Sequence, residues 1–346
     1  MKKSYFLISV LLSAARLFSQ ENSQAQTSPW SLELSPFFTV RYGEQKEFVY
    51  TENLSGNMVT LSQLDWEESP VYFFNLNASG EYKNFMLSAG AKIALPSDTG
   101  KMYDSDWQNI NVLDPTEELY SVKTDYSNHT NHLNLYYGFS GQFSYSIEFN
   151  NLSAAPFNAL KINSIALSPF AEFEYSYSSF TGKGGSGQYG YENKNDSPKH
   201  TYNDPVFSHT SDFSGDVIQL ERISYVTWAG LSFNLNFHQD FYTVLSCAVN
   251  PFIYVQSLDS HLTTNYYFYD TMHEFFSGYK LGLTVGKYFN AHHAAFVKAN
   301  FMCIDTIKGS TAYSVGSKTG TYNSSNDTCG ASFEWFEVSL GYTYRF

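Results

Sequence analysis

Three things are scarce in this sequence of 346 residues: cysteine, basic residues and long apolar runs. The three cysteines, Cys247, Cys303 and Cys329, are odd in number and lack metal-ligand spacing, so no disulfide framework is predicted, although one disulfide stays open. Lys and Arg number 20 against 33 Asp and Glu, which gives a net charge of -13. Without a basic stripe that could displace counterions from phosphates, nucleic acid is excluded as a partner.

The only markedly apolar run lies at the N-terminus, where Lys2 and Lys3 precede an apolar stretch at 5–15. We interpret residues 1–20 as a secretory signal peptide, with a cleavage site anywhere up to residue 25. No later run approaches the ~20 apolar residues of a membrane-spanning helix, so a membrane protein of this sequence has to cross as a β-barrel. No linker or low-complexity segment divides residues 30–346, which are predicted to form a single domain.

Aromatic residues, in contrast, are abundant at 18%, and they coexist with a negative mean hydropathy of -0.30. Strict alternation of apolar and polar residues accounts for both values. It is clearest in the last twelve residues, where one face of a strand is entirely apolar or aromatic. Lipid on one side of a strand and a polar lumen on the other give this pattern. The apolar face comprises Phe336, Val338, Leu340, Tyr342, Tyr344 and Phe346.

Connections of two lengths separate the alternating runs. Short turns are expected near 80–84, 150–151, 238–240 and 290–293, and long polar loops at 43–58, 104–128, 181–215, 259–271 and 308–328. Short turns at one rim and long loops at the other are typical of outer-membrane barrels. The sequence therefore predicts an all-β fold, a ten-stranded antiparallel transmembrane β-barrel with long extracellular loops extending above the membrane.

Two pairs of ionisable residues lie where predicted strands enter the long loops. Asp104 and Asp106 follow the third strand, and Asp259 and His261 follow the seventh. Residues two apart on a strand share one face. Because the third and seventh of ten strands lie nearly opposite each other, the two pairs are expected to meet across the mouth of the barrel.

The parity of the third strand places both aspartates in the lumen, since odd-numbered residues from Phe85 to Leu95 face lipid. The seventh strand is less simple. Its apolar residues also occupy odd positions, so Asp259 and His261 turn inward only if a β-bulge or the barrel's twist shifts the register. The odd apolar positions are Leu245, Val249, Ile253 and Val255.

Six short motifs, taken together and in order, resemble the omptins, a family of bacterial outer-membrane endopeptidases built as ten-stranded barrels. They are QKEFVY at 45–50, LSQLDW at 61–66, MYDSDW at 102–107, SFTGKGGS at 179–186, DSH at 259–261 and GYTYRF at 341–346. The resemblance implies an aspartyl-type protease in the outer membrane whose active site faces the extracellular side.

The resemblance also implies a role for each candidate residue. Asp259 would orient His261, the general base toward a water molecule, and Asp104 and Asp106 would hold that water from the facing wall. A neutral imidazole can take the proton near physiological pH, which is worth ~10²–10⁴-fold in rate. For substrate binding the resemblance implies Glu47, which would bind a substrate's arginine or lysine, and Met102. Basic peptides or proteins, cut at or between basic residues, are therefore the expected substrates.

Two departures from the family pattern bear on specificity and on lipid. Ser257 stands where family members commonly have a second acid. The outer-wall stretch at 173–177, which would contact lipopolysaccharide, has no arginine, and Arg222 is the nearest candidate. No metal and no other cofactor is expected. The resemblance implies that lipopolysaccharide supports activity, but the missing arginine argues against dependence on it, and another outer-membrane lipid could take its place. The protein is expected to be a monomer.

Blander interpretations remain open. Acidic pairs in loops are commonly just solvated, and the chain could then be an inactive barrel that acts as an adhesin or surface antigen, or a small porin. Asp125, His129 and His132 suggest a metal site but lack a defined third ligand, and are interpreted as loop or girdle residues. The glycine-rich run at 182–187 lacks the spacing of a phosphate-binding loop and is interpreted as a hairpin tip.

Overall fold

The computed structural model describes residues 30–53, 55–107, 122–150, 161–192 and 199–346, so the predicted signal peptide lies outside the described residues. The described chain is almost entirely β-strand. Its only helical element is the 3-10 turn η1 (His238–Asp240). The strands are β1 (Trp30–Glu52), β2 (Met58–Glu67), β3 (Val71–Tyr82), β4 (Phe85–Ala94), β5 (Ser97–Trp107), β6 (Lys123–Tyr145), β7 (Ile147–Asn150), β8 (Ile162–Tyr189), β9 (His209–Phe237), β10 (Phe241–His261), β11 (Tyr266–Glu274), β12 (Gly278–Tyr288), β13 (His293–Val315) and β14 (Asn323–Arg345).

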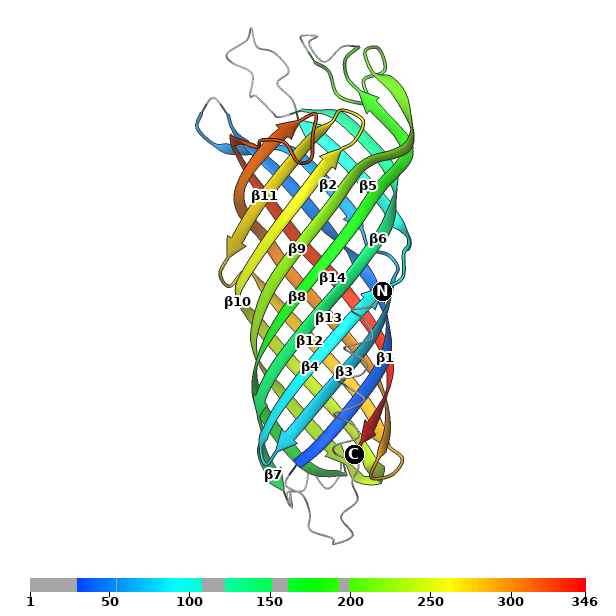
Figure 1. Cartoon of the computed structure of the whole chain (residues 1–346), viewed down its shortest axis with the longest axis vertical. Coiled ribbons are helices and arrows are strands. Elements are labelled where there is room, and N and C mark those ends of the chain that lie inside the picture. The colour runs from blue at the N-terminus through cyan, green and yellow to red at the C-terminus, as the bar shows by residue number, and fades with distance from the viewer. Residues whose placement is uncertain (1–29, 54, 108–121, 151–160, 193–198) are drawn as a thin grey trace.

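All strands join one antiparallel sheet that closes on itself as a tilted barrel (Figure 1). Closure comes from the pairing of β1 with β14, which runs from Glu33 opposite Arg345 to Tyr50 opposite Thr328. Closure removes the exposed strand edges that an open sheet would present. Within the described residues, no helix has the length and apolarity needed to span a membrane.

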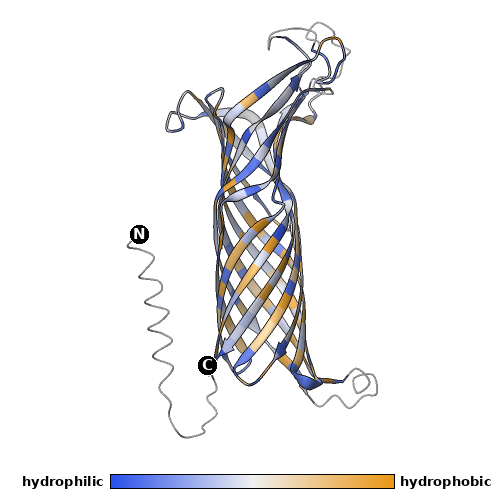
Figure 2. Ribbon diagram, turned by 90° about the vertical axis from the view of Figure 1, so that its right-hand side faces the viewer, coloured by the Kyte–Doolittle hydropathy of each residue, from blue (hydrophilic) through white to orange (hydrophobic). Residues whose placement is uncertain are grey.

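The outer face of the lower barrel carries the predicted apolar belt. In β14, Val338, Leu340 and Tyr342 are exposed, whereas Ser339 and Thr343 point into the lumen and are buried. Figure 2 shows apolar residues gathered along the lower barrel, with the wall above it more mixed. The alternation predicted from the C-terminal sequence is confirmed, and it places the belt at the end of the barrel that holds the C-terminus (Figure 1).

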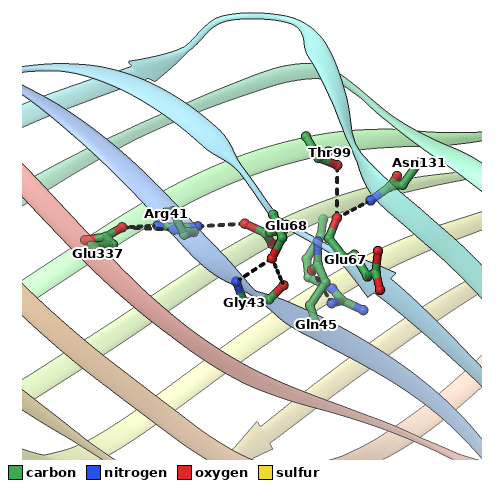
Figure 3. A network of polar contacts seen from close by, with 10 residues as sticks. Arg41, Gly43, Gln45, Glu67, Glu68, Thr99, Asn131 and Glu337 are labelled. Carbon is green, nitrogen blue, oxygen red and sulfur yellow. Dashed lines mark hydrogen bonds and ion pairs between the residues drawn. The ribbon is translucent and has the colours of Figure 1, made fainter.

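Ion pairs lie in the lumen of this barrel. The guanidinium of Arg41, with 0% exposure, lies 2.9 Å from Oε2 of Glu68 and 2.7 Å from Oε1 of Glu337 (Figure 3). It also lies over the rings of Phe73, Tyr136 and Trp335. Also in the lumen, Lys280 binds Glu172 and Glu174 at 2.6 and 2.7 Å. Buried charges require such partners, so these pairs are part of how the lumen is filled.

The Arg41 network lies where β2 gives way to β3 along β1. There the backbone of Glu68 exchanges two hydrogen bonds with Gly43, at 3.1 and 2.8 Å. A Cβ atom at Gly43 would overlap the carbonyl oxygen of Glu334 on β14, so only glycine allows this close approach. In Figure 3 the backbone carbonyl of Glu67, the residue before Glu68, accepts hydrogen bonds from Thr99 and Asn131.

The register of β10 changes between Val249 and Phe252, where it gains one residue relative to β9. Val249 is exposed below this bulge, but Ile253 and Val255 above it are fully buried. The sequence placed Ile253 and Val255 on the lipid face, and that placement is wrong. The bulge is the register shift that Asp259 and His261 require to turn inward.

The strands continue well into the segments predicted as loops. β1 extends to Glu52, β8 to Tyr189, β10 to His261 and β13 to Val315, and β9 already begins at His209. The predicted loop boundaries are therefore wrong in the same direction. The candidate site residues lie on strands, which hold side chains more rigidly than loops do. The three cysteines, all in the described part of the chain, are unpaired.

Candidate active site

The two predicted pairs lie at the end of the barrel away from the C-terminus, above the apolar belt. Asp104 and Asp106 belong to β5, and Asp259 and His261 end β10. The last exposed large apolar residue before the first pair is Leu95, between β4 and β5, and before the second pair it is Val249 on β10. Both pairs therefore lie in the part of the barrel that rises above the belt.

Asp259 and His261 form one unit. Oδ2 of Asp259 lies 2.8 Å from Nε2 of His261, and the ring of Phe268 packs edge-on against the imidazole. Burial by itself would lower the pKa of His261, but the charge and hydrogen bond of Asp259, together with the charges of Asp104 and Asp106, raise it to about 9. The imidazole thus interacts electrostatically with acids on both walls of the mouth.

Asp104 faces this unit from the opposite wall. Its Oδ1 atom is buried and has no hydrogen-bond partner within the described chain. Burial and the charge of Asp106 raise the pKa of the Asp104 carboxyl, whereas the charge of His261 lowers it. The structure thereby brings Asp104, Asp106, Asp259 and His261 into one electrostatic site.

A further acid at the site was not recognised from the sequence as part of it. Asp125, on β6, lies opposite Asp106 in the register and is buried. Its two oxygens accept hydrogen bonds from the hydroxyls of Tyr191 and Thr124. Burial and then the charges of Asp104, Asp125 and Asp106 raise the pKa of Tyr189 to about 12. The sequence signal available was that Asp125 lies near the start of the strand that follows the MYDSDW motif.

Glu47 is buried and each of its carboxylate oxygens accepts a hydrogen bond. Oε1 accepts a hydrogen bond from Nη2 of Arg222 at 2.9 Å, and Oε2 accepts one from the indole of Trp66 at 3.0 Å. Arg222 was considered from sequence as an outer-wall lipid contact, which is wrong, because it points into the lumen and is 2% exposed. Burial raises the pKa of Glu47, and Arg222 opposes that rise.

One row of residues crosses β9, β10 and β11 at this level. Arg222 lies opposite Ser257, and Ser257 lies opposite Asp270. Asp270 is buried, its Oδ1 lacks a hydrogen bond within the described residues, and burial raises its pKa to about 6. The acid absent at Ser257 is therefore matched by one on the neighbouring strand, which no short motif could indicate.

Met102 is completely buried in an apolar cluster beneath the site, with Leu64, Trp66, Leu133 and Phe180. This packing supports β5 directly below Asp104. Its predicted contact with substrate stays a prediction.

The two histidines considered as metal ligands have different partners and lie in different surroundings. His129 is buried and bonded to the hydroxyl of Ser127 and the carbonyl of Gly184, whereas His132 binds Asp98 at 2.7 Å on the outside. Across the described ranges no cluster of three or more His, Cys, Asp or Glu side chains is arranged for a metal ion.

The chain is similar to known proteins in both sequence and structure. The model of the Omptin family matches residues 31–346. The structure is similar to that of the outer membrane protease OmpT from Escherichia coli, with a TM-score of 0.73 and 18% sequence identity over 94% of this chain and 100% of that chain. The outer membrane protein OprG from Pseudomonas aeruginosa is far less similar, with a TM-score of 0.37 and 8% identity over 91% and 95% of the two chains. No curated protein sequence matches the chain.

Proposed function

Because the chain belongs to the omptin family, we propose that it is an outer-membrane endopeptidase that uses Asp104, Asp106, Asp259 and His261 to activate a water molecule. The observation that carries this proposal is the hydrogen-bonded Asp259–His261 unit, which shares one electrostatic site with the Asp104 carboxyl of the opposite wall.

We group the strands as ten membrane crossings. β2 and β3 follow each other along β1, β4 and β5 along β6, and β11 and β12 along β10, so each of these three pairs counts as one crossing. With β7 continuing β6, ten crossings result. An even number returns the chain to the rim where it began, and the site would then face the outside of the cell.

In the proposed mechanism His261 donates Nε2–H to Asp259 and uses Nδ1 as the base. As the water oxygen attacks the carbonyl carbon of the peptide, its proton passes to Nδ1, and Asp259 stabilises the resulting imidazolium. The Asp104–Asp106 pair holds the water and, through its shared proton, the carbonyl oxygen. When the carbon–nitrogen bond breaks, the imidazolium returns the proton to the leaving amine.

Basic peptides and proteins are the proposed substrates, because the charge of the mouth attracts them over long distances. The mouth carries Asp104, Asp106 and Asp259, and a cleft lined by one sign of charge attracts peptides of the other sign. This attraction does not decide which side chain docks beside the scissile bond, because Glu47 is already paired with Arg222. We also propose that the protein is a monomer in the outer membrane. Lipopolysaccharide or a similar lipid around it would support activity.

The test is hydrolysis of internally quenched peptides by the refolded protein, with and without lipopolysaccharide. The set pairs peptides carrying Arg or Lys with peptides carrying uncharged residues at the same positions. Cleavage should disappear in His261→Ala and Asp104→Ala. It should persist in His132→Ala, a matched control that removes an outward histidine paired with Asp98.

Two results would oppose the proposal. Cleavage unchanged in His261→Ala and Asp104→Ala would place the activity elsewhere. No cleavage by the folded wild-type protein in any lipid would favour the inactive barrel that acts as an adhesin or surface antigen.

A further inference from the structure

Both carboxylate oxygens of Glu47 already have partners inside the protein, and one of these partners is a cation. One carboxylate oxygen is bound by Arg222 and the other by Trp66. Glu47 is only 5% exposed, so both bonds are largely shielded from water. A basic side chain of a substrate would have to displace the guanidinium to reach Glu47.

Arg222 is correspondingly fixed. Its Nε donates to the hydroxyl of Ser257 at 2.9 Å, and its Nη1 donates to the side-chain carbonyl of Gln45 at 2.5 Å. The guanidinium also lies 5.2 Å from the centre of the Phe333 ring. Displacing it would separate the buried guanidinium from its bonded carboxylate, Glu47, and breaking a buried ion pair is strongly unfavourable.

The ion pair lies directly beside the proposed catalytic residues. On one wall Glu47 and Asp104 flank Leu64 in the register, about 10 Å apart across two strand spacings. On the other wall Arg222 lies opposite Ser257, two residues below Asp259 on the same face of β10. A side chain that enters the lumen next to the scissile bond therefore meets the Glu47–Arg222 pair.

We propose that Arg222 is a specificity-determining residue that occupies the cation site of Glu47 from within, so that the substrate side chain docked there is uncharged. This inference rests on the proposed function for its meaning in catalysis. The occupancy of Glu47, however, is a property of the folded chain that binding alone can test.

The first experiment measures binding of N-ethylguanidinium to the refolded protein in detergent micelles by calorimetry. Arg222→Ser leaves Glu47 with a space of guanidinium size, and it should bind the ligand at least tenfold more tightly than wild type. Arg222→Ser combined with Glu47→Gln should lose that gain. Arg345→Ser, which frees Glu33 of an exposed pair at the lower rim, is the matched control and should not gain binding.

The second experiment compares wild type and Arg222→Ser on peptides that differ only in Arg or Gln beside the scissile bond. Wild type should show no preference for Arg, and Arg222→Ser should prefer it by about ten- to a hundredfold in kcat/KM, since a hydrogen bond between charged groups is of that strength. The gain should appear mainly in KM, which a loss of structure would not produce.

Several results would overturn the inference. They are binding of N-ethylguanidinium to wild type that Glu47→Gln abolishes, a wild-type preference for Arg above tenfold, or a folded Arg222→Ser that gains no binding. The wild-type arms decide even if Arg222→Ser fails to fold. Absence of any His261-dependent cleavage would oppose the proposed protease, while the calorimetry would still decide whether Glu47 is occupied.

Discussion

Asp259 and His261 are joined by a 2.8 Å hydrogen bond although they belong to the same strand, two residues apart. The carboxylate is buried and the imidazole is 27% exposed, so the pair presents its histidine, and not its acid, to the mouth of the barrel. Asp259 thereby fixes which ring nitrogen remains available as a base and favours the charged form of the ring.

Replacing Asp259 with Asn keeps the size of the side chain but removes the charge that favours the imidazolium of His261. Removal of the carboxylate charge should lower the pKa of His261 from about 9 toward its ordinary value near 6.5. Peptide hydrolysis should fall by ~10²–10⁴-fold, because the stabilised imidazolium is lost. NMR titration of labelled histidine and peptidase assays measure the two quantities. Asp98→Asn, which alters the outward His132 pair, should change neither the His261 pKa nor the rate.

The pH dependence of hydrolysis follows from the same residues. Only neutral His261 accepts a proton, so kcat/KM of the wild type should rise as pH increases through the pKa of about 9. Asp106 contributes to that pKa, and Asp106→Asn should lower it. The rising limb should then move to lower pH, even though the maximal rate falls. A limb that stays in place would show that His261 is not the group being titrated.

The stability of the lower barrel should depend on Arg41. Arg41→Ala leaves Glu68 and Glu337 without their shared partner in a buried setting, and the free energy of unfolding should drop by about 3–5 kcal/mol. Arg345→Ala breaks the more exposed pair with Glu33 and should cost about 1 kcal/mol or less. Denaturant unfolding in micelles, followed by tryptophan fluorescence, compares the two. Equal losses would mean that the Arg41 network is no more than a surface pair.

The sequence predicted the features that depend on neighbours along one strand. Alternation placed Val338, Leu340 and Tyr342 on the lipid face, and the structure agrees. It also placed Asp104 inward, but for an incomplete reason. Ala94, Thr99 and Met102 are all buried, so parity changes once between β4 and β5 and again within β5, and the two changes cancel.

Features that depend on distant strands were not predictable. Arg222 and Glu47 are 175 residues apart, and no periodicity indicates that they meet across the lumen. Asp270 and Ser257 become neighbours only through the pairing of β11 with β10. The extension of the strands into polar segments escaped prediction because both faces of a strand above the membrane can be polar.

One further signal was present in the sequence. Pro251 lies within the bulge of β10, and proline inside a strand pattern is found at edges and bulges. It marks the point where odd-numbered residues change from the lipid face to the lumen. The orientation of Asp259 and His261 therefore depends on the number of residues at this position, and not on proline itself.

Deleting Pro251 should abolish activity, whereas replacing it should not. The deletion removes the extra residue of β10, so Asp259 and His261 would turn to the outer face, and Ile253 and Val255 would leave the lumen with them. Pro251→Ala keeps the residue count and should retain hydrolysis within a fewfold of wild type. Peptidase assays measure the loss, and heat-modifiable migration in gels checks that both variants form barrels. A folded deletion variant with wild-type hydrolysis would contradict the assignment of Asp259 and His261, because neither side chain could then reach the lumen.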